Sequence, residues 1–131
     1  MRAVLQVGYG APGGVLRVTD VPRPAPGEDG ILVEIRASTV TRGDAIAVRG
    51  QEYRFMRLFT GIRRPRQPIT GSEFAGVVEA VGPAVTSFRV GDRVFGIASV
   101  ADAEFVVVRD HGVVAHVPSG LSFEDAAAVP D

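Results

Sequence analysis

Apolar and polar residues alternate along most of the chain in short runs that glycine and proline interrupt. Alternation with a period of two predicts β-strands with one buried face. Such runs occupy residues 2–7, 15–21 and 31–36. Further short strands are predicted at 93–95, at 103–108, which is β-branched and apolar, and at 113–117. A longer run, 74–81, is apolar or small apart from Glu79, which predicts a strand buried on both faces for much of its length. Many short strands with glycine and proline turns are typical of a small barrel or sandwich.

Two short helices are predicted where a hydroxyl residue precedes an acidic residue by three positions. In this capping-box spacing, the hydroxyl accepts a hydrogen bond from the backbone of the third helical residue, and the acidic side chain returns one to the cap. The first helix begins after Thr41, has Asp44 at its third position and ends at Gly50. The second begins after Ser122 and cannot pass Pro130.

Residues 8–13 satisfy the pattern G-x-G-x-x-G directly after a strand. A dinucleotide-binding loop needs the last glycine to open a helix whose N-terminus faces the pyrophosphate. Here Pro12 lies inside the motif, and alternation resumes directly after Gly14. We therefore predict a hairpin turn without a helix, and no nucleotide loop.

Composition excludes several classes of site. A chain of 131 residues fits one domain and has no room for a second, nucleotide-binding one. Its net charge of −1 gives no electrostatic basis for binding nucleic acid or an anionic membrane. The absence of cysteine excludes disulfides and thiolate metal sites. Because the N-terminal segment lacks a signal-peptide layout and no apolar run approaches roughly 20 residues, we expect a cytoplasmic protein.

Two further segments are candidates for binding. Gly71 and Gly76 interrupt the central strand, and a strand glycine marks a bend or a close approach, for which a ligand is one candidate. Residues 51–67 combine three aromatic residues with five arginines and have little periodicity. This segment is either a solvated loop with its aromatic rings packed against the barrel, or the wall of a substrate cleft or a contact to another domain.

Several motifs, in order along the chain, resemble the catalytic domain of the medium-chain dehydrogenase/reductase family, the alcohol dehydrogenase and quinone oxidoreductase group. They are residues 1–4, 37–44, 71–78 (Gly-Ser-Glu-Phe-Ala-Gly-Val-Val), 90–96 and 118–130. The resemblance implies a mainly β domain with short helices, a GroES-like, partly open β-barrel, over residues 1–121. Residues 122–131 would begin the helix that leads into a Rossmann domain, which lies outside these residues.

The resemblance also bears on metal binding. In zinc-containing members the catalytic metal is held by a cysteine and a histidine, among other ligands, and the matching positions here are Thr41 and Ser72. Hydroxyl groups do not replace a thiolate and an imidazole as zinc ligands. The chain is therefore similar to the zinc-free branch, the quinone oxidoreductases and enone reductases, and we expect no metal.

Candidate site residues follow from the same comparison. We expect hydroxyl, acidic, basic and aromatic side chains to line one cleft: Thr41, Asp44 and Ser72 as catalytic residues, and Arg42, Tyr53 and Phe59 as substrate-binding residues. The position of Thr41 lies near the nicotinamide in the family, so Thr41 is also the candidate cofactor-binding residue. A plain helix cap remains the alternative for Thr41 and Asp44, and a paired carboxylate that steadies the start of the strand is the alternative for Glu73.

The implied function is that of the substrate-side domain of a zinc-independent NAD(P)H-dependent oxidoreductase. It would orient a small carbonyl or quinone substrate against NADPH or NADH, which a partner Rossmann domain holds. The resemblance is compatible with a homodimer of the full-length form. We expect the chain alone to be inactive and to bind NADPH weakly or not at all. The alternative is a stand-alone barrel that serves as a binding or interaction module; a co-chaperonin-like ring former is disfavoured because no long apolar loop is present.

Overall fold

The computed structural model describes residues 1–50, 55 and 57–130. In chain order the elements are β1 (Arg2–Gln6), α1 (Pro12–Val15), β2 (Leu16–Asp20), β3 (Gly30–Ser38), α2 (Arg42–Arg49), α3 (Arg57–Thr60), β4 (Glu73–Val81), β5 (Arg93–Ile97), β6 (Phe105–Arg109), β7 (Val114–His116) and α4 (Phe123–Ala127). None of the helices in the described ranges is long and apolar enough to cross a membrane.

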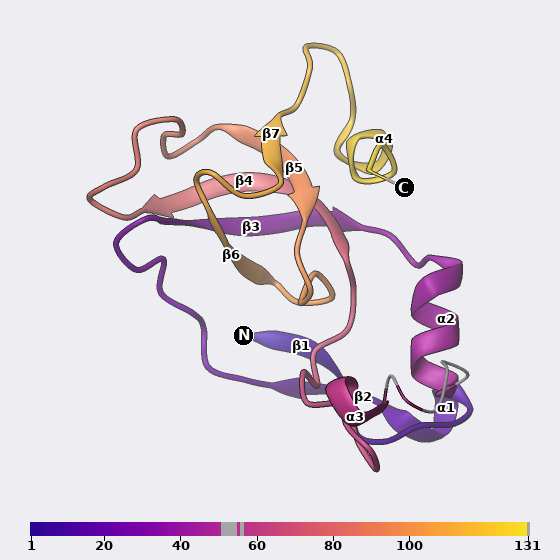
Figure 1. Ribbon diagram of the computed structural model, residues 1–131. Helices are drawn as coiled ribbons and strands as arrows, with labels where there is room; N and C mark the ends of the chain where they lie inside the picture. The colour runs from indigo at the N-terminus through magenta and orange to yellow at the C-terminus, as the bar shows by residue number, and fades with distance from the viewer. Residues whose placement is uncertain (51–54, 56, 131) are drawn as a thin grey trace.

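An antiparallel five-stranded sheet in the order β6-β3-β4-β5-β7 forms the centre of the domain, and a separate β1-β2 hairpin lies beside it (Figure 1). The sheet curls into a half-barrel. Short helices lie at its margins, with α4 next to the strands β3, β4 and β5. The predicted mainly β, partly open barrel with short helices is confirmed.

The strands β3 and β4 carry the main core. Side chains on one face of the sheet form a cluster that includes Ile31, Val33, Phe74 and Val78. On β4 the neighbouring residue Ala75 points the other way and packs with the small residues of α4, which is why this strand is buried on both faces as predicted. The expectation of a half-buried strand at 31–36 is wrong at its start, because Leu32 is buried as well.

The strand glycines fit close approaches within the protein. A methyl group at Gly76 would overlap the backbone carbonyl of Glu34 in the adjacent strand β3. Gly71 has a φ of 91°, and a side chain there would meet Asp102. Of the two explanations offered by the sequence, the close approach is therefore the correct one. At both positions the approaching group belongs to the chain itself.

The hairpin at the N-terminus differs in one detail from the prediction. β1 and β2 pair in antiparallel fashion, which confirms the hairpin. The turn nevertheless contains the four-residue helix α1, which begins at Pro12 without a side-chain cap and buries no residue. Proline favours the first turn of a helix because its φ is already helical and its missing N–H is not needed there. The prediction that no helix follows the glycines was therefore wrong, although α1 is a single turn.

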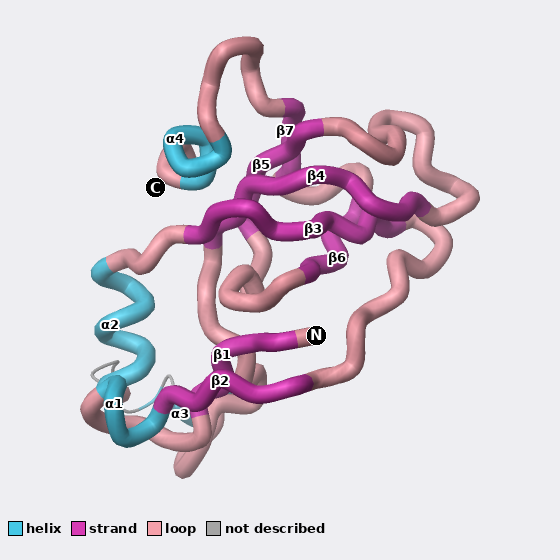
Figure 2. Tube along the Cα trace, turned by 180° about the vertical axis from the view of Figure 1, so that it is seen from behind, coloured by secondary structure: helices cyan, strands magenta, loops and turns pink. Residues whose placement is uncertain are grey.

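The other edge of β1 is bonded to the segments that precede β4 and β6. The amide of Gln6 donates to the carbonyl of Pro68 at 2.7 Å, and Thr70 donates to Val4 at 3.1 Å. Val4 in turn donates to Asp102 at 2.9 Å. Figure 2, the view from behind, shows the β1-β2 hairpin beside the lower part of the loop that leads up into β4. This pairing fixes the segment that carries Ser72 beside β1 and α2.

Candidate functional site

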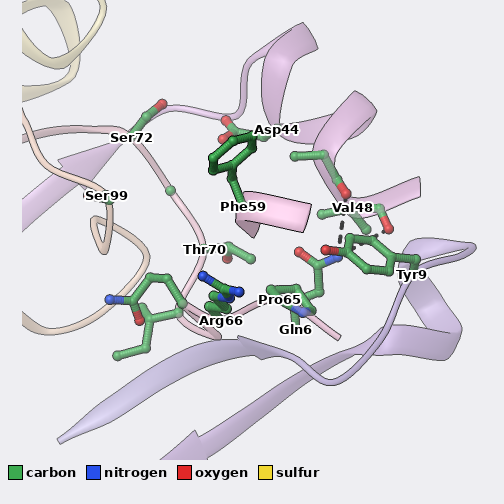
Figure 3. Close-up of a pocket in the computed structure, with 14 residues that line it drawn as sticks. Gln6, Tyr9, Asp44, Val48, Phe59, Pro65, Arg66, Thr70, Ser72 and Ser99 are labelled. Atoms are coloured by element: carbon green, nitrogen blue, oxygen red, sulfur yellow. Dashed lines mark hydrogen bonds between the residues drawn. The ribbon is translucent and has the colours of Figure 1, made fainter. Parts of the chain in front are cut away.

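A cavity of about 360 Å³ lies between β1, α2, α3 and the segment that leads into β4 (Figure 3). Apolar side chains provide much of its wall, among them Val48, Phe59 and Ile69. Eight of the 14 lining residues are polar, and they come from different elements: Gln6, Tyr9, Asp44, Arg66, Gln67, Thr70, Ser72 and Ser99. A cavity that combines an apolar wall with placed polar groups is the usual form of a small-molecule site.

The helix α2 brings Asp44 to this cavity through the predicted capping box. The backbone N–H of Asp44 donates to Thr41 Oγ1 at 3.2 Å, and Asp44 Oδ2 accepts from the Thr41 backbone at 2.8 Å. Thr41 Oγ1 also donates to Asp44 Oδ2 at 3.0 Å. The helix ends at Gly50 in the left-handed conformation, with a φ of 67°. Since the Thr41 hydroxyl has one hydrogen and gives it to Asp44, it can offer a ligand only a lone pair.

Three of the six predicted site residues line the cavity: Asp44, Phe59 and Ser72. Thr41 holds Asp44 but is not among the lining residues, and Arg42 is exposed on the first turn of α2 and does not line the cavity either. Tyr53 lies outside the described residues.

Two of the three aromatic residues in the segment 51–67, Phe55 and Phe59, lie within the described residues, and both are largely exposed. Phe59 is 71% exposed although it borders the cavity, and Phe55 is 61% exposed. The interpretation in which these rings are tucked against the barrel is therefore wrong for both. The alternative, a wall of a cleft, agrees with the position of Phe59.

Comparison with known proteins decides the family. Residues 27–119 match the family described as alcohol dehydrogenase GroES-like domain. The chain belongs to this family. It is the N-terminal domain of the medium-chain dehydrogenase/reductase type.

Relatives of this GroES-like domain are longer proteins. The chain is 35% identical over 132 residues to a quinone oxidoreductase of Lama guanicoe, covering 98% of this chain and 37% of that protein. Among solved structures, a Pseudomonas syringae quinone oxidoreductase has a TM-score of 0.79 at 30% identity, over 98% of this chain and 37% of the other. A mycobacterial protein complexed with NADPH has a TM-score of 0.77 at 36% identity, over 97% of this chain and 35% of the other. The GroES-like domain thus spans little more than a third of the length of these relatives.

Sequence analysis missed the polar residues that β1 and its turn contribute to the site. Gln6 is 5% exposed, and its side-chain amide bonds to the end of α2. The hydroxyl of Tyr9 donates to the carbonyl of Gly61 at 2.8 Å, which joins the turn after β1 to the segment after α3. The sequence signal that could have found Gln6 is a side-chain amide at the end of the otherwise mostly apolar strand β1, because a buried polar group needs hydrogen-bond partners.

Two carboxylates of this GroES-like domain, the buried Glu73 and the half-buried Asp102, accept hydrogen bonds from hydroxyl groups. Glu73, the first residue of β4, is 6% exposed and accepts a hydrogen bond from the hydroxyl of Thr39. Asp102 accepts from Ser38 Oγ at 3.1 Å and from Thr70 Oγ1 at 2.8 Å. The described residues contain no group of three histidine, cysteine, aspartate or glutamate side chains that could hold a metal ion.

Proposed function

We propose that this GroES-like domain is the substrate-side half of a zinc-independent NAD(P)H-dependent oxidoreductase that acts on a small carbonyl or quinone compound. The observation that carries the proposal is the cavity at the Gly71-Ser72 step, which Asp44 and Phe59 also border. The relatives named quinone oxidoreductase support this choice of substrate, and the relative complexed with NADPH supports the choice of cofactor.

The donor atoms near the cavity argue for a mechanism without zinc. Thr41 and Ser72 offer hydroxyl groups, which are poor zinc ligands at neutral pH because they stay protonated. The only hydrogen of the Thr41 hydroxyl is committed to Asp44. These residues do not fit a zinc ion, so the proposal routes no step through a metal.

Residues of this chain would position the substrate and exclude water from it. The apolar wall at Val48, Phe59 and Ile69 takes the ring of the substrate, and the hydroxyl of Ser72 orients its carbonyl group. The remaining lone pair of Thr41 is available to an N–H or O–H group of the cofactor or the substrate. When bound, the nicotinamide supplies the hydride.

The cofactor would be held by a partner Rossmann domain. In this chain the glycines of residues 8–13 lie in the connection between β1 and β2, and α1, which begins at Pro12 within that motif, is a single helical turn. A pyrophosphate needs a longer helix that follows a parallel strand. NADPH and NADH are both compatible with this division of labour.

A second candidate is a stand-alone binding module, which the presence of a cavity within these 131 residues favours. One experiment separates the two. The chain replaces the matching N-terminal domain of the mycobacterial relative, and oxidation of NADPH by quinones is followed in the chimera. We expect quinone-dependent turnover, reduced at least about 10-fold by Ser72→Ala. If the chimera folds and binds NADPH but none of the quinones supports NADPH oxidation, the enzymatic proposal is contradicted and the binding module remains.

A further inference from the structure

Gln6 carries a buried amide whose orientation is fixed by the protein. Its side-chain Nε2 donates to the carbonyl oxygens of Gly8 at 2.8 Å and Val48 at 3.2 Å, and lies 3.5 Å from that of Ala47. These carbonyls come from the turn after β1 and from the last turn of α2, whose final carbonyl groups need donors. A flipped amide would set an oxygen against the same carbonyl oxygens, so this orientation is the only favourable one.

Within the described ranges, the amide oxygen of Gln6 has no hydrogen-bond donor. Among the described residues, no N–H or O–H group bonds to Oε1, although Gln6 is only 5% exposed. Figure 3 shows the amide nitrogen directed toward Val48 and the oxygen turned away from it, toward the interior of the cavity. Buried polar atoms are normally hydrogen-bonded, and one left without a partner destabilises the protein.

Neighbouring donors that line the cavity are engaged elsewhere. The hydroxyl of Tyr9 donates to Gly61, and that of Thr70 donates to Asp102 at 2.8 Å. Arg66 donates from Nη2 to the carbonyl of Leu58 at 3.1 Å. Gln67, Ser72 and Ser99 also border the cavity, and none of the hydrogen bonds among the described residues joins them to Gln6. A group bound inside the cavity is therefore the candidate donor for Gln6 Oε1.

We propose that Gln6 Oε1 is a substrate-positioning acceptor, and that the cavity takes a small, ring-bearing molecule with a hydroxyl group that donates to it. A neutral hydroxyl fits better than an ammonium group, since the wall at Val48, Pro65 and Ile69 is apolar and a buried cation would be costly. The one carboxylate that lines the cavity, Asp44, already accepts two hydrogen bonds from Thr41. This inference rests on the proposed function and narrows its substrate class: the compound carries a hydroxyl in addition to its carbonyl. Figure 3 places Gln6 and Ser72 at opposite sides of the cavity, so the two groups would contact different ends of the molecule.

The test compares two ligands and two proteins. Naphthol and its methyl ether share a ring and differ in the hydrogen that the hydroxyl donates. Their dissociation constants are measured with the native chain and with Gln6→Met, which keeps the length of the side chain and removes the amide. We expect the native chain to prefer naphthol about 10-fold, and the preference to fall below about 2-fold in Gln6→Met. The same substitution at the exposed, cavity-lining Gln67 should leave the preference intact.

A purely structural role of the amide gives a different result. In that case Gln6→Met weakens both ligands by the same factor, and the proposal is overturned. It is equally overturned if the native chain binds neither ligand or binds both alike, the latter being expected if water satisfies Oε1. Should Gln6→Met fail to fold, the carbonyl carbon of Gln6 is followed by nuclear magnetic resonance in the native chain, where naphthol, and not its ether, must shift the signal. No nicotinamide is involved, so a failure here is distinct from a failure of turnover in the chimera.

Discussion

Asp92, in the turn before β5, accepts two hydrogen bonds through one carboxylate oxygen. The backbone N–H of Arg89 donates at 2.9 Å, and His116 Nε2 lies 3.1 Å away on β7. The backbone bond first, and the His116 side chain second, hold the pKa of Asp92 below its usual value. Because the bonds favour the ionised carboxylate, they stabilise the folded state only while Asp92 is charged.

The resulting prediction concerns the pH dependence of stability. Asp92→Asn should lower the free energy of unfolding by about 1 kcal/mol at neutral pH. A carboxyl group with a lowered folded-state pKa contributes stability above its unfolded value of about 3.9 and loses it as the pH falls through the folded value. The difference between native chain and variant should therefore shrink below about pH 4. Urea unfolding over a pH series measures it; a difference that grows toward acid pH would disprove the assignment.

Gly76 tests the close approach of β4 to β3. Gly76→Ala would force a methyl group into the carbonyl of Glu34, so we expect a loss of at least about 2 kcal/mol in unfolding free energy. Gly13→Ala is the matched control, because no atom lies within 4 Å of a methyl group there and the residue is helical. That control should be neutral or slightly stabilising. Equal effects of the two substitutions in denaturant unfolding would refute the packing argument.

At the scale of elements, the caps of α2 and α4 allow a comparison of stability with binding. Thr41→Ala removes a cap whose loss costs about 1 kcal/mol, and it frees Asp44 at the cavity. Ser122→Ala removes the corresponding bond to Asp125 in α4, whose N-cap residue does not line the cavity. Both variants should lose similar stability in thermal unfolding. Only Thr41→Ala should also lower the affinity for naphthol severalfold, because only this cap positions a residue of the cavity. Thr41→Ser should restore both stability and affinity. A loss of naphthol binding in Ser122→Ala would contradict this prediction.

Local signals were the ones that the sequence carried well. The cap at Thr41, the stop at Gly50 and the alternation of β1 and β2 depend on neighbours a few residues apart, and all were predicted. The burial of Leu32 could not be predicted in this way, because it depends on which parts of the folded chain cover the second face of the sheet. Gln6 was missed for the same reason: its partners on α2 lie about 40 residues further along the chain.

Within the candidate site, the family motifs pointed to Asp44 and Ser72, and both line the cavity. Thr41 and Arg42 belong to the same motif as Asp44 but do not line it. Phe59 borders the cavity, which agrees with the interpretation of its segment as a cleft wall. The contributions of Gln6 and Tyr9 arise from the way the hairpin is bonded to the segment before β4, a long-range pairing that periodicity does not report.

At the scale of the whole molecule, the curled sheet and the hairpin together form the cavity that we propose as the substrate site. The glycines that resemble a nucleotide loop turn the hairpin, and the longest described helix, α2, has its N-terminal turn occupied by its own capping box. Helix N-termini bind phosphate through free backbone N–H groups, which this capping box partly uses. The GroES-like domain is therefore expected to need a partner domain to hold the cofactor.

Titration calorimetry of NADPH into the purified 131-residue chain tests this division most directly. If the chain provides the substrate side only, the dissociation constant should be weaker than about 1 mM. Binding in the micromolar range would contradict the account, because it would require a nucleotide site within these residues.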